Sequence, residues 1–455
     1  MRTLRRRNWI LLGLLGFGAC TPVRPPEAPA PPVPEVLQPA PDPEPVGPAR
    51  PAVAPEVRGV WVVRTSLTSP ASVTEMVERT HAAGFNTLLV QVRGRGDAFY
   101  RSALEPRSDA LAGAAGDFDP LAAVIREAHR RGMKVHAWVV AQLVWGLGPL
   151  PTDPDHLVNR HPDWLSVPEP LAEALWGADP WDPGFPTALH EWAQANRTRV
   201  EGLFVDPGHP EVRERLGAVV RDLLLGYDLD GVHLDYLRYS SPDFDYSRRS
   251  LERFRDWAGA QVPRGLAASL DDRVRRGDVT AWARENPGLW DSFRETRVTG
   301  LLREVRRTMD ATAPDAVLSV AVFADPVDAE RGRFQDWPSW LTYGDVDALA
   351  PMAYTPDDER FADLMRAATE ADGDRGGARV WAGVGIYQTT VDGAVRKVDL
   401  ARASGVAGVV LFSYDWAREQ GPLGNGEPYL EGLARRAFFP GSSPDAPPGT
   451  FPPGG

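Results

Sequence analysis

Residues 227–239, YDLDGVHLDYLRY, place ionisable side chains inside an otherwise apolar run. A carboxylate such as Asp235 is costly to bury in a strand unless a function or a partner uses it. At the end of such a strand it could act as a nucleophile, or stabilise the positive charge that develops when a glycosidic bond breaks. We expect an arginine nearby to keep it ionised. The alternative is that Asp235 only pairs with Arg93 or Arg238 and closes the end of the strand layer.

Cleavage of a glycosidic bond normally needs a second carboxyl group. Asp325 and Asp415 both follow apolar runs and could face Asp235. We favour Asp325 as the second catalytic residue, because the run before it adjoins the run that carries Asp235. The alternative is that Asp325 caps a helix or turn in the sequence ADPVDAE.

Polar and aromatic side chains also stand at the ends of the other apolar runs, and we expect them to bind the substrate. This set comprises Gln91, Arg93, His136, Trp138, His233, Tyr236, Arg238, Tyr354, Tyr387, Tyr414 and Asp415. The aromatic rings could stack on sugars, while the glutamine and the histidines could hydrogen-bond hydroxyl or amide groups. The histidines could instead bind a metal with Asp235, but no H-x-H or H-E-x-x-H spacing is present, so we expect no metal and no cofactor.

Eight short apolar runs could position these residues. They cover residues 58–63, 87–92, 134–140, 231–237, 317–323, 348–354, 380–386 and 408–414. Segments of helical periodicity separate them, which predicts an α/β fold, the closed TIM-type (β/α)8 barrel. A doubly wound open sheet shares this alternation, but no G-x-G-x-x-G follows the first run. In a barrel the carboxyl ends of all strands meet around one opening, where the side chains named above would converge.

Two long stretches exceed what a minimal barrel needs. Residues 141–205 follow the third run and residues 239–287 follow the fourth. Both would leave from the face where barrels build their sites, so we expect them to shape a cleft. No second linker interrupts the chain, and we expect one domain over residues 57–440.

The two ends have a different composition. Residues 1–20 combine a basic start, a short apolar run and Cys20, the single cysteine, which is the layout of a lipoprotein signal. The alternative is an ordinary secretory signal in which Cys20 is incidental. Residues 21–56 are rich in Pro and Ala, typical of an extended spacer, and residues 441–455 predict a disordered tail. We therefore expect an exported protein that a lipid anchors to the bacterial envelope. The net charge of -12 argues against nucleic acid as a partner.

Several motifs, in order, resemble the glycosyl hydrolase-like family ten, bacterial envelope proteins with a barrel fold. They are RGVWVV, GFNTLLVQVRGRGDAFYRS, DPLAAVIREAHRRGMKVHAW, DPGHPEVRERL and YDLDGVHLDYLRY. The family's Q-V-R falls on residues 91–93, its H-A-W on 136–138, and its D-G-x-H-x-D-Y-x-R-Y on 230–239. Ser240 departs from the proline of many relatives, so we expect a different path for the loop that follows.

The resemblance implies a glycosidase that acts on a cell-wall polysaccharide, such as peptidoglycan glycan strands. Arg93, Arg95 and Arg238 would suit a substrate that carries carboxylates, such as the lactyl groups of muramic acid. One alternative is an envelope protein that binds glycan without cleaving it, and another is a scaffold for other envelope proteins.

Overall fold

The computed structural model describes residues 56–419 and 428–439. The expected signal segment with Cys20, the spacer as far as residue 55 and the tail from residue 441 lie outside the described residues. Within them, no helix combines the length and the apolar character needed to cross a bilayer.

Eight parallel strands close into a barrel in the order β1-β10-β9-β8-β7-β6-β3-β2. They are β1 (Val57–Val62), β2 (Thr87–Arg93), β3 (Lys134–Val140), β6 (Gly231–Asp235), β7 (Val317–Phe323), β8 (Ala348–Met352), β9 (Trp381–Gly385) and β10 (Gly408–Phe412). Hydrogen bonds between β1 and β10 complete the ring, with Arg58 opposite Val409. The prediction of a closed (β/α)8 barrel is confirmed, and each of the eight apolar runs forms one of its strands.

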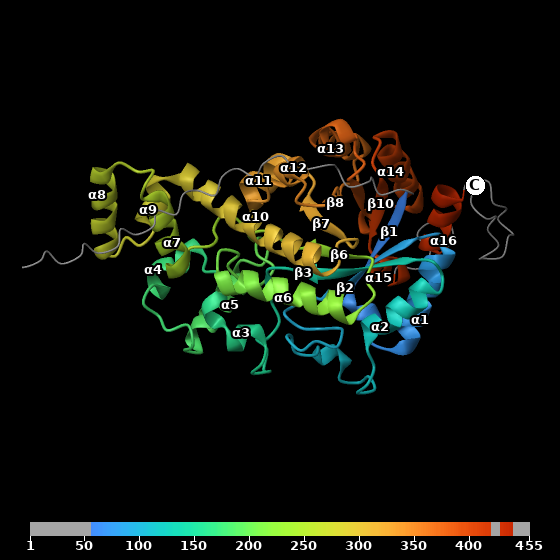
Figure 1. Cartoon of the computed structure of the whole chain (residues 1–455), viewed down its shortest axis with the longest axis horizontal. Helices are drawn as coiled ribbons and strands as arrows, with labels where there is room; N and C mark the ends of the chain where they lie inside the picture. Colours follow the sequence, from blue (N-terminus) through green and yellow to red (C-terminus); the bar gives the residue numbers. More distant parts are fainter. Residues whose placement is uncertain (1–55, 420–427, 440–455) are drawn as a thin grey trace, which may run out of the picture. The chain divides into compact units, whose positions relative to one another are not determined.

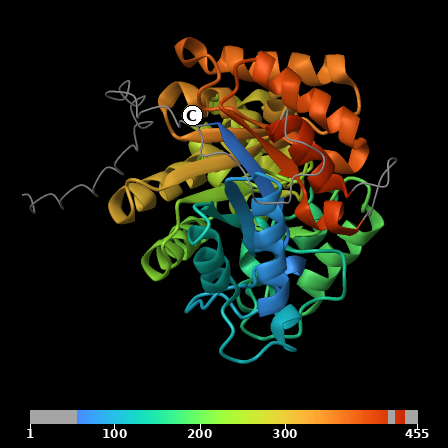
Figure 2. The same cartoon turned by 90° about the vertical axis from the view of Figure 1, so that its right-hand side faces the viewer.

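Helices lie outside the strands (Figures 1 and 2). The longer ones are α1 (Pro70–Ala82), α2 (Pro120–His129), α6 (Pro210–Gly226), α10 (Pro287–Thr312), α13 (Asp358–Ala371) and α14 (Val391–Ala403). Shorter ones are α11 (Pro326–Arg333), α12 (Trp337–Tyr343), α15 (Tyr414–Glu419) and α16 (Tyr429–Leu433). Outward strand residues such as Val60, Leu88 and Val135 are fully buried against this helical layer. Strands covered on both faces must be almost continuously apolar, which is why the runs were recognisable in the sequence.

Large side chains fill the inside of the barrel. Trp61, Trp138 and Trp381 alternate with outward-facing residues and pack in one interior cluster with Leu89 and Val410. Small residues make room for them and for two histidines. A Cβ on Gly231 would come 2.7 Å from the ring of His136, so no larger residue fits there. The interior is therefore a packed core, and a ligand can approach only from its rim.

Two insertions leave the carboxyl ends of β3 and β6, as predicted. The first contains β4 (Leu143–Trp145) and β5 (Leu203–Phe204), an antiparallel pair, together with α3 (Leu157–Arg160), α4 (Ala172–Leu175) and α5 (Gly184–Ala195). The second contains α7 (Arg248–Ala258), α8 (Arg264–Arg275) and α9 (Ala281–Glu285), which gather at one end of α10 (Figure 1). This second insertion packs against the start of α10 in a separate core, in which Phe254 and Trp282 of the insertion contact Trp290 and Phe293 of α10.

Two buried carboxyl groups join the insertions. Ser250 Oγ lies 3.0 Å from Oδ2 of Asp206, in the first insertion, and 3.0 Å from Oδ2 of Asp245, in the second. Asp245 Oδ1 also accepts a hydrogen bond of 2.6 Å from the backbone N of Val167. Ser250 has one hydroxyl hydrogen, so one of the two carboxyl groups must itself carry a proton to complete both contacts. Burial raises the pKa of both groups, and repulsion from Asp206 helps to raise the pKa of Asp245 to about 7.

This pair makes the stability of the domain depend on pH. Between about pH 4 and pH 7 the folded protein holds a proton on Asp245 that the unfolded chain releases, so stability falls as pH rises through this range. In Asp245→Asn the amide donates to Ser250 without titrating. We expect the free energy of unfolding of this variant to fall less steeply with pH than that of the wild type. The two slopes should differ by up to about 1.4 kcal/mol per pH unit, measured by urea unfolding at pH 5 to 8. Asp315→Asn, at an exposed residue between α10 and β7, should keep the wild-type slope. Equal slopes for all three proteins would contradict the shared proton.

Candidate active site

Asp235 is the last residue of β6, and its carboxylate lies at the carboxyl end of the barrel. Trp138 Nε1 donates a hydrogen bond of 3.1 Å to its Oδ2, and the backbone N of Tyr236 donates one of 2.7 Å to its Oδ1. Tyr236 has a φ of 53°, in the left-handed region that non-glycine residues seldom adopt. This turn of the backbone directs an amide toward the carboxylate. Strained backbone of this kind is concentrated at functional sites.

Burial raises the pKa of Asp235, and the Tyr236 amide, the charge of Arg238 and the Trp138 hydrogen bond offset only part of that effect. Arginine charges therefore favour the ionised form of this carboxylate, as expected, but they do not outweigh the effect of burial. Among the described residues, no arginine nitrogen lies within 4.0 Å of the Asp235 carboxylate, so the alternative of a closing ion pair with Arg93 or Arg238 is wrong.

Arg238 is buried and paired with a residue of the first insertion. Its Nη2 donates to Oε1 of Glu201 at 2.7 Å, and its guanidinium lies 4.5 Å from the ring centre of Tyr236. The ring of Phe323, at the end of β7, is 5.2 Å away on another side. These contacts hold the rim together and leave Arg238 already neutralised. The structure thus corrects the expectation that Arg238 binds a carboxylate of the substrate.

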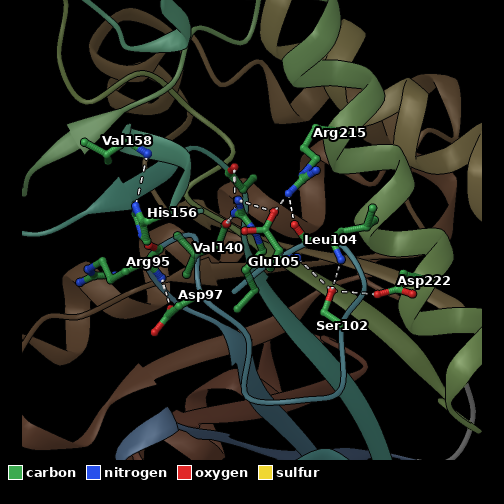
Figure 3. A network of polar contacts seen from close by, with 12 residues as sticks. Arg95, Asp97, Ser102, Leu104, Glu105, Val140, His156, Val158, Arg215 and Asp222 are labelled. Atoms are coloured by element: carbon green, nitrogen blue, oxygen red, sulfur yellow. Dashed lines mark hydrogen bonds and ion pairs between the residues drawn. The ribbon is translucent and has the colours of Figure 1, made fainter. Parts of the chain in front are cut away.

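Arg93 is also a structural residue. Its Nη2 lies 3.5 Å from Oε1 of Glu105, its Nη1 donates to the carbonyl of Val140 at the end of β3, and both charged side chains are fully buried. Arg215 of α6 reaches the same carboxylate, with its Nε at 3.2 Å (Figure 3). Glu105 thereby ties the loop after β2 to β3 and to α6. Arg93, which the sequence predicted to bind substrate, instead neutralises the buried side chain of Glu105.

The two histidines lie inside the barrel, beneath the mouth. His233 Nε2 accepts from Trp61 Nε1 at 3.0 Å, and its Nδ1 lies 2.9 Å from Ser319 Oγ. The indole can only donate, so Nδ1 carries the hydrogen, and burial keeps the pKa of His233 well below its usual value. His136 lies two residues before Trp138 on the same face of β3, and burial lowers its pKa to about 4. The expectation that these histidines contact substrate is corrected, because both are enclosed.

Aromatic rings do form one side of the mouth. Tyr354, after β8, stacks on Phe412 with ring centres 5.5 Å apart and an interplanar angle of 28°. Tyr387 contacts both rings edge to face, at 5.9 Å from Tyr354 and 6.1 Å from Phe412, and remains 40% exposed. Phe412 also lies 6.4 Å from Trp138, the hydrogen-bond donor to Asp235. Tyr354, Tyr387 and Phe412 thus give a stacking surface close to the carboxyl group.

Asp325 is not placed as a second catalytic group. Its Oδ1 accepts from the backbone N of Val327 and of Asp328, so it is the N-cap of α11. Its Oδ2 accepts from Arg360 at 2.5 Å, and this bond holds the pKa of Asp325 below its usual value. A proton donor needs the opposite shift. The helix-cap alternative noted from the sequence is the correct one.

Asp415 and Tyr414 have structural contacts as well. Asp415 Oδ2 accepts from Val63 N at 2.6 Å, and its Oδ1 accepts from Ser66 Oγ at 2.6 Å and Thr65 Oγ1 at 3.0 Å. These bonds join α15 to the loop after β1. Tyr414 is 1% exposed within the main core, near the charges of α1, and burial raises its pKa to about 12. The expectations that Asp415 binds substrate and that Tyr414 stacks on a sugar are corrected.

Sequence reasoning missed several residues of the mouth. Gln91, which it did name, accepts from Arg64 Nη1 at 2.8 Å, and Arg64 was not considered. Trp61, Phe412 and Glu201 were also overlooked. A signal existed for two of these: Trp61 and Phe412 occupy inward positions in the alternation of β1 and β10. Arg64 and Glu201 lie in loops, where no periodicity marks a side chain that faces the mouth.

The buried position of Glu105 gives a direct test of the network around it. Glu105→Gln leaves Arg93 as an uncompensated buried charge, and we expect a loss of about 3 to 5 kcal/mol in the free energy of unfolding, measured by urea denaturation. Glu78→Gln breaks the pair between Glu78 and Arg131, where the glutamate is 57% exposed, and should cost about 0 to 1 kcal/mol. Equal losses in the two variants would show that Glu105 is not essential to the fold.

Comparison with solved structures supports the fold. The glycoside hydrolase domain of PgaB (BpsB) from Bordetella bronchiseptica superposes with a TM-score of 0.59 at 15% identity, covering 84% of this chain and 99% of that one. The catalytic domain of β-amylase from Paenibacillus polymyxa gives 0.52 at 12% identity, with the same two coverages. At these identities the likeness concerns the barrel alone.

Sequence comparison identifies relatives. Glycosyl hydrolase YngK of Bacillus subtilis (strain 168) is 25% identical over 302 residues, which is 62% of this chain and 48% of YngK. Glycosyl hydrolase DigH of Escherichia coli (strain K12) is 24% identical over 346 residues, 66% of either protein. The chain therefore spans about half of YngK and about two thirds of DigH. The model of the family described as glycosyl hydrolase-like 10 matches residues 56–388, and the chain belongs to that family, as its motifs indicated.

Proposed function

We propose that this protein is a glycoside hydrolase that cleaves a polysaccharide of the bacterial cell envelope, most simply the glycan strands of peptidoglycan. The observation that carries the proposal is the position of Asp235. Its carboxyl group lies at the carboxyl end of a closed barrel and close to a cluster of aromatic rings, and no arginine of the described residues lies within 4.0 Å of it.

The environment of Asp235 suits the acid step of the reaction. A buried carboxyl group with a raised pKa stays protonated at a pH where an exposed one has ionised, and it can then protonate the oxygen of the leaving sugar. The Trp138 and Tyr236 N–H groups fix the carboxyl group in place and stabilise the carboxylate that remains after proton transfer. We therefore assign Asp235 as the proton donor, in place of the nucleophile or stabiliser of positive charge expected from the sequence.

The substrate class rests on the rim and on the family. Tyr354, Tyr387 and Phe412 provide flat apolar surfaces of the kind that stack on sugar rings. The motifs around Gln91, His136 and Asp235 resemble those of envelope glycosidases, which supports a wall glycan as the polymer. The relatives YngK and DigH are both described as glycosyl hydrolases.

Replacing the proposed acid tests the function. Asp235→Asn keeps the size of the side chain but has no proton to give, and we expect kcat on peptide-free glycan strands to fall by about 10²- to 10⁴-fold. The measurement is release of soluble sugar fragments, with substrate binding followed in parallel. Asp325→Asn is the matched control, and its kcat should stay within about threefold of wild type because Asp325 caps α11 away from this chemistry.

Two results would count against the proposal. Unchanged cleavage by Asp235→Asn would remove Asp235 from the reaction. Glycan that binds to the wild-type protein and is never cut would instead support the non-catalytic alternative, an envelope protein that only holds the polymer.

We also propose that the protein is exported and held on a membrane by a lipid on Cys20, which rests on the sequence of residues 1–20. Cys20→Ala removes the only thiol and with it the acceptor of the lipid. We expect the wild-type protein in the membrane fraction and the variant in the soluble fraction after cell lysis without detergent. Membrane recovery of both proteins would refute lipid anchoring at this residue.

A further inference from the structure

Two arginines follow the first two strands of the barrel and lie at its mouth. Arg64 comes two residues after β1, and Arg95 comes two residues after β2. Both side chains contact Gly94. Arg95 Nη1 donates to the Gly94 carbonyl at 2.7 Å, and a Cβ on Gly94 would come 2.8 Å from Arg64 Nη1. The glycine therefore lets Arg64 lie against the backbone and brings the two guanidinium groups into one small region.

Neither guanidinium has a carboxylate partner within 4.0 Å among the described residues. Arg64 Nη1 donates to the neutral side chain of Gln91 at 2.8 Å, and Arg95 donates to a backbone carbonyl. Other arginines around the mouth are paired: Arg93 with Glu105, Arg238 with Glu201, and Arg360 with Asp325. Partly buried cations of this kind normally have a counter-charge, and repulsion between two neighbouring cations makes a counter-charge still more favourable.

The nearest acidic groups do not fill this role. Asp97 uses its Oδ1 to accept from the backbone N of Arg95 at 2.9 Å, and the Arg95 guanidinium points away from it (Figure 3). Asp235 accepts hydrogen bonds from Trp138 and Tyr236, and among the described residues no arginine nitrogen lies within 4.0 Å of its carboxylate. Arg64 is partly buried, and burial lowers its pKa; the charge of Arg95 adds to this effect, and the charge of Asp97 offsets only part of it. The remaining N–H groups of the two guanidinium groups could therefore donate to an anion that is not part of the chain.

We propose that Arg64 and Arg95 together bind a carboxylate carried by the glycan, at a sugar next to the bond that Asp235 protonates. This inference rests on the proposed function and deepens it, because it makes the substrate an acidic polysaccharide. Guanidinium groups offer paired N–H donors that match the two oxygens of a carboxylate. Two sources share this chemistry, the lactyl ether of muramic acid and a uronic acid.

Binding to an uncleaved glycan tests the proposal directly. In the Asp235→Asn background, calorimetry would compare GlcNAc–MurNAc oligosaccharides with the same oligosaccharides after reduction of the carboxyl group to an alcohol. A glucuronic acid-containing oligosaccharide of equal length is the third ligand and separates the two sources. We expect reduction of the carboxyl group to weaken binding by about 10- to 100-fold, the loss typical of a charged hydrogen-bonded contact.

Arg64→Gln and Arg95→Gln should each weaken binding of the carboxylate form by about tenfold or more and leave the reduced form almost unchanged. Arg95→Gln is the safer variant for folding, because the Arg95 guanidinium has only a backbone partner. Arg276→Gln is the control for net charge. This 67% exposed side chain follows α8, which Figure 1 shows away from the barrel strands.

These measurements distinguish failure of the carboxylate site from failure of the proposed hydrolase function. The carboxylate site is overturned if the protein binds the carboxylate and reduced glycans with equal affinity. It is also overturned if the arginine variants lose the same affinity for both forms. In either case the hydrolase proposal stands. Preference for the glucuronic acid ligand keeps the site and changes its source. Absence of binding and of cleavage with every glycan overturns the proposed function and this inference with it.

Discussion

The hydrogen bond from Trp138 to Asp235 depends on the pairing of β3 with β6 in the barrel, and the candidate site depends on both. Trp138 belongs to β3 and Asp235 to β6, which are neighbours in the ring although 97 residues separate them along the chain. Below this bond the interior is packed by Trp61, Trp381 and the two histidines, so water is excluded from beneath the carboxyl group. A carboxyl group in such surroundings keeps its proton more tightly than an exposed one, and the barrel thereby sets its chemistry.

Arginines around the mouth divide into those that build it and those left to bind. Arg93 and Arg238 satisfy buried or half-buried glutamates and join the long loops to the strand ends. Breaking such a pair leaves a charge without compensation, so these residues serve the fold. Among the described residues, Arg64 and Arg95 have only neutral hydrogen-bond partners, and we propose that a ligand supplies their counter-charge. The same residue type has two different roles, and the difference lies entirely in whether a carboxylate is within reach.

The insertions after β3 and β6 supply the partners that complete this arrangement. Glu201, in the first, neutralises Arg238, which directly precedes the second. Asp206 and Asp245 meet at Ser250 farther from the mouth, where a shared proton links the two segments. Such pairings could not be read from the chain, because each joins residues of two irregular segments whose relative position only the folded barrel defines. The positions of the insertions could be predicted, since their length and composition interrupt the strand and helix alternation.

The sequence by itself determined the barrel and its eight strands, because burial on both faces demands continuous apolar runs. It also determined the family, through its motifs. The strand ends drew attention because side chains at the carboxyl ends of barrel strands meet around one opening. The sequence also singled out Asp235 correctly as a buried carboxyl group at a strand end. Only the tertiary structure decided which polar residues have partners. Asp325 is a helix cap, Arg93 and Arg238 are paired, and His233 is enclosed, because charge pairing and burial depend on distances between segments far apart in the chain. A one-dimensional pattern records the type and spacing of side chains, whereas their electrostatic environment exists only once the ring has closed.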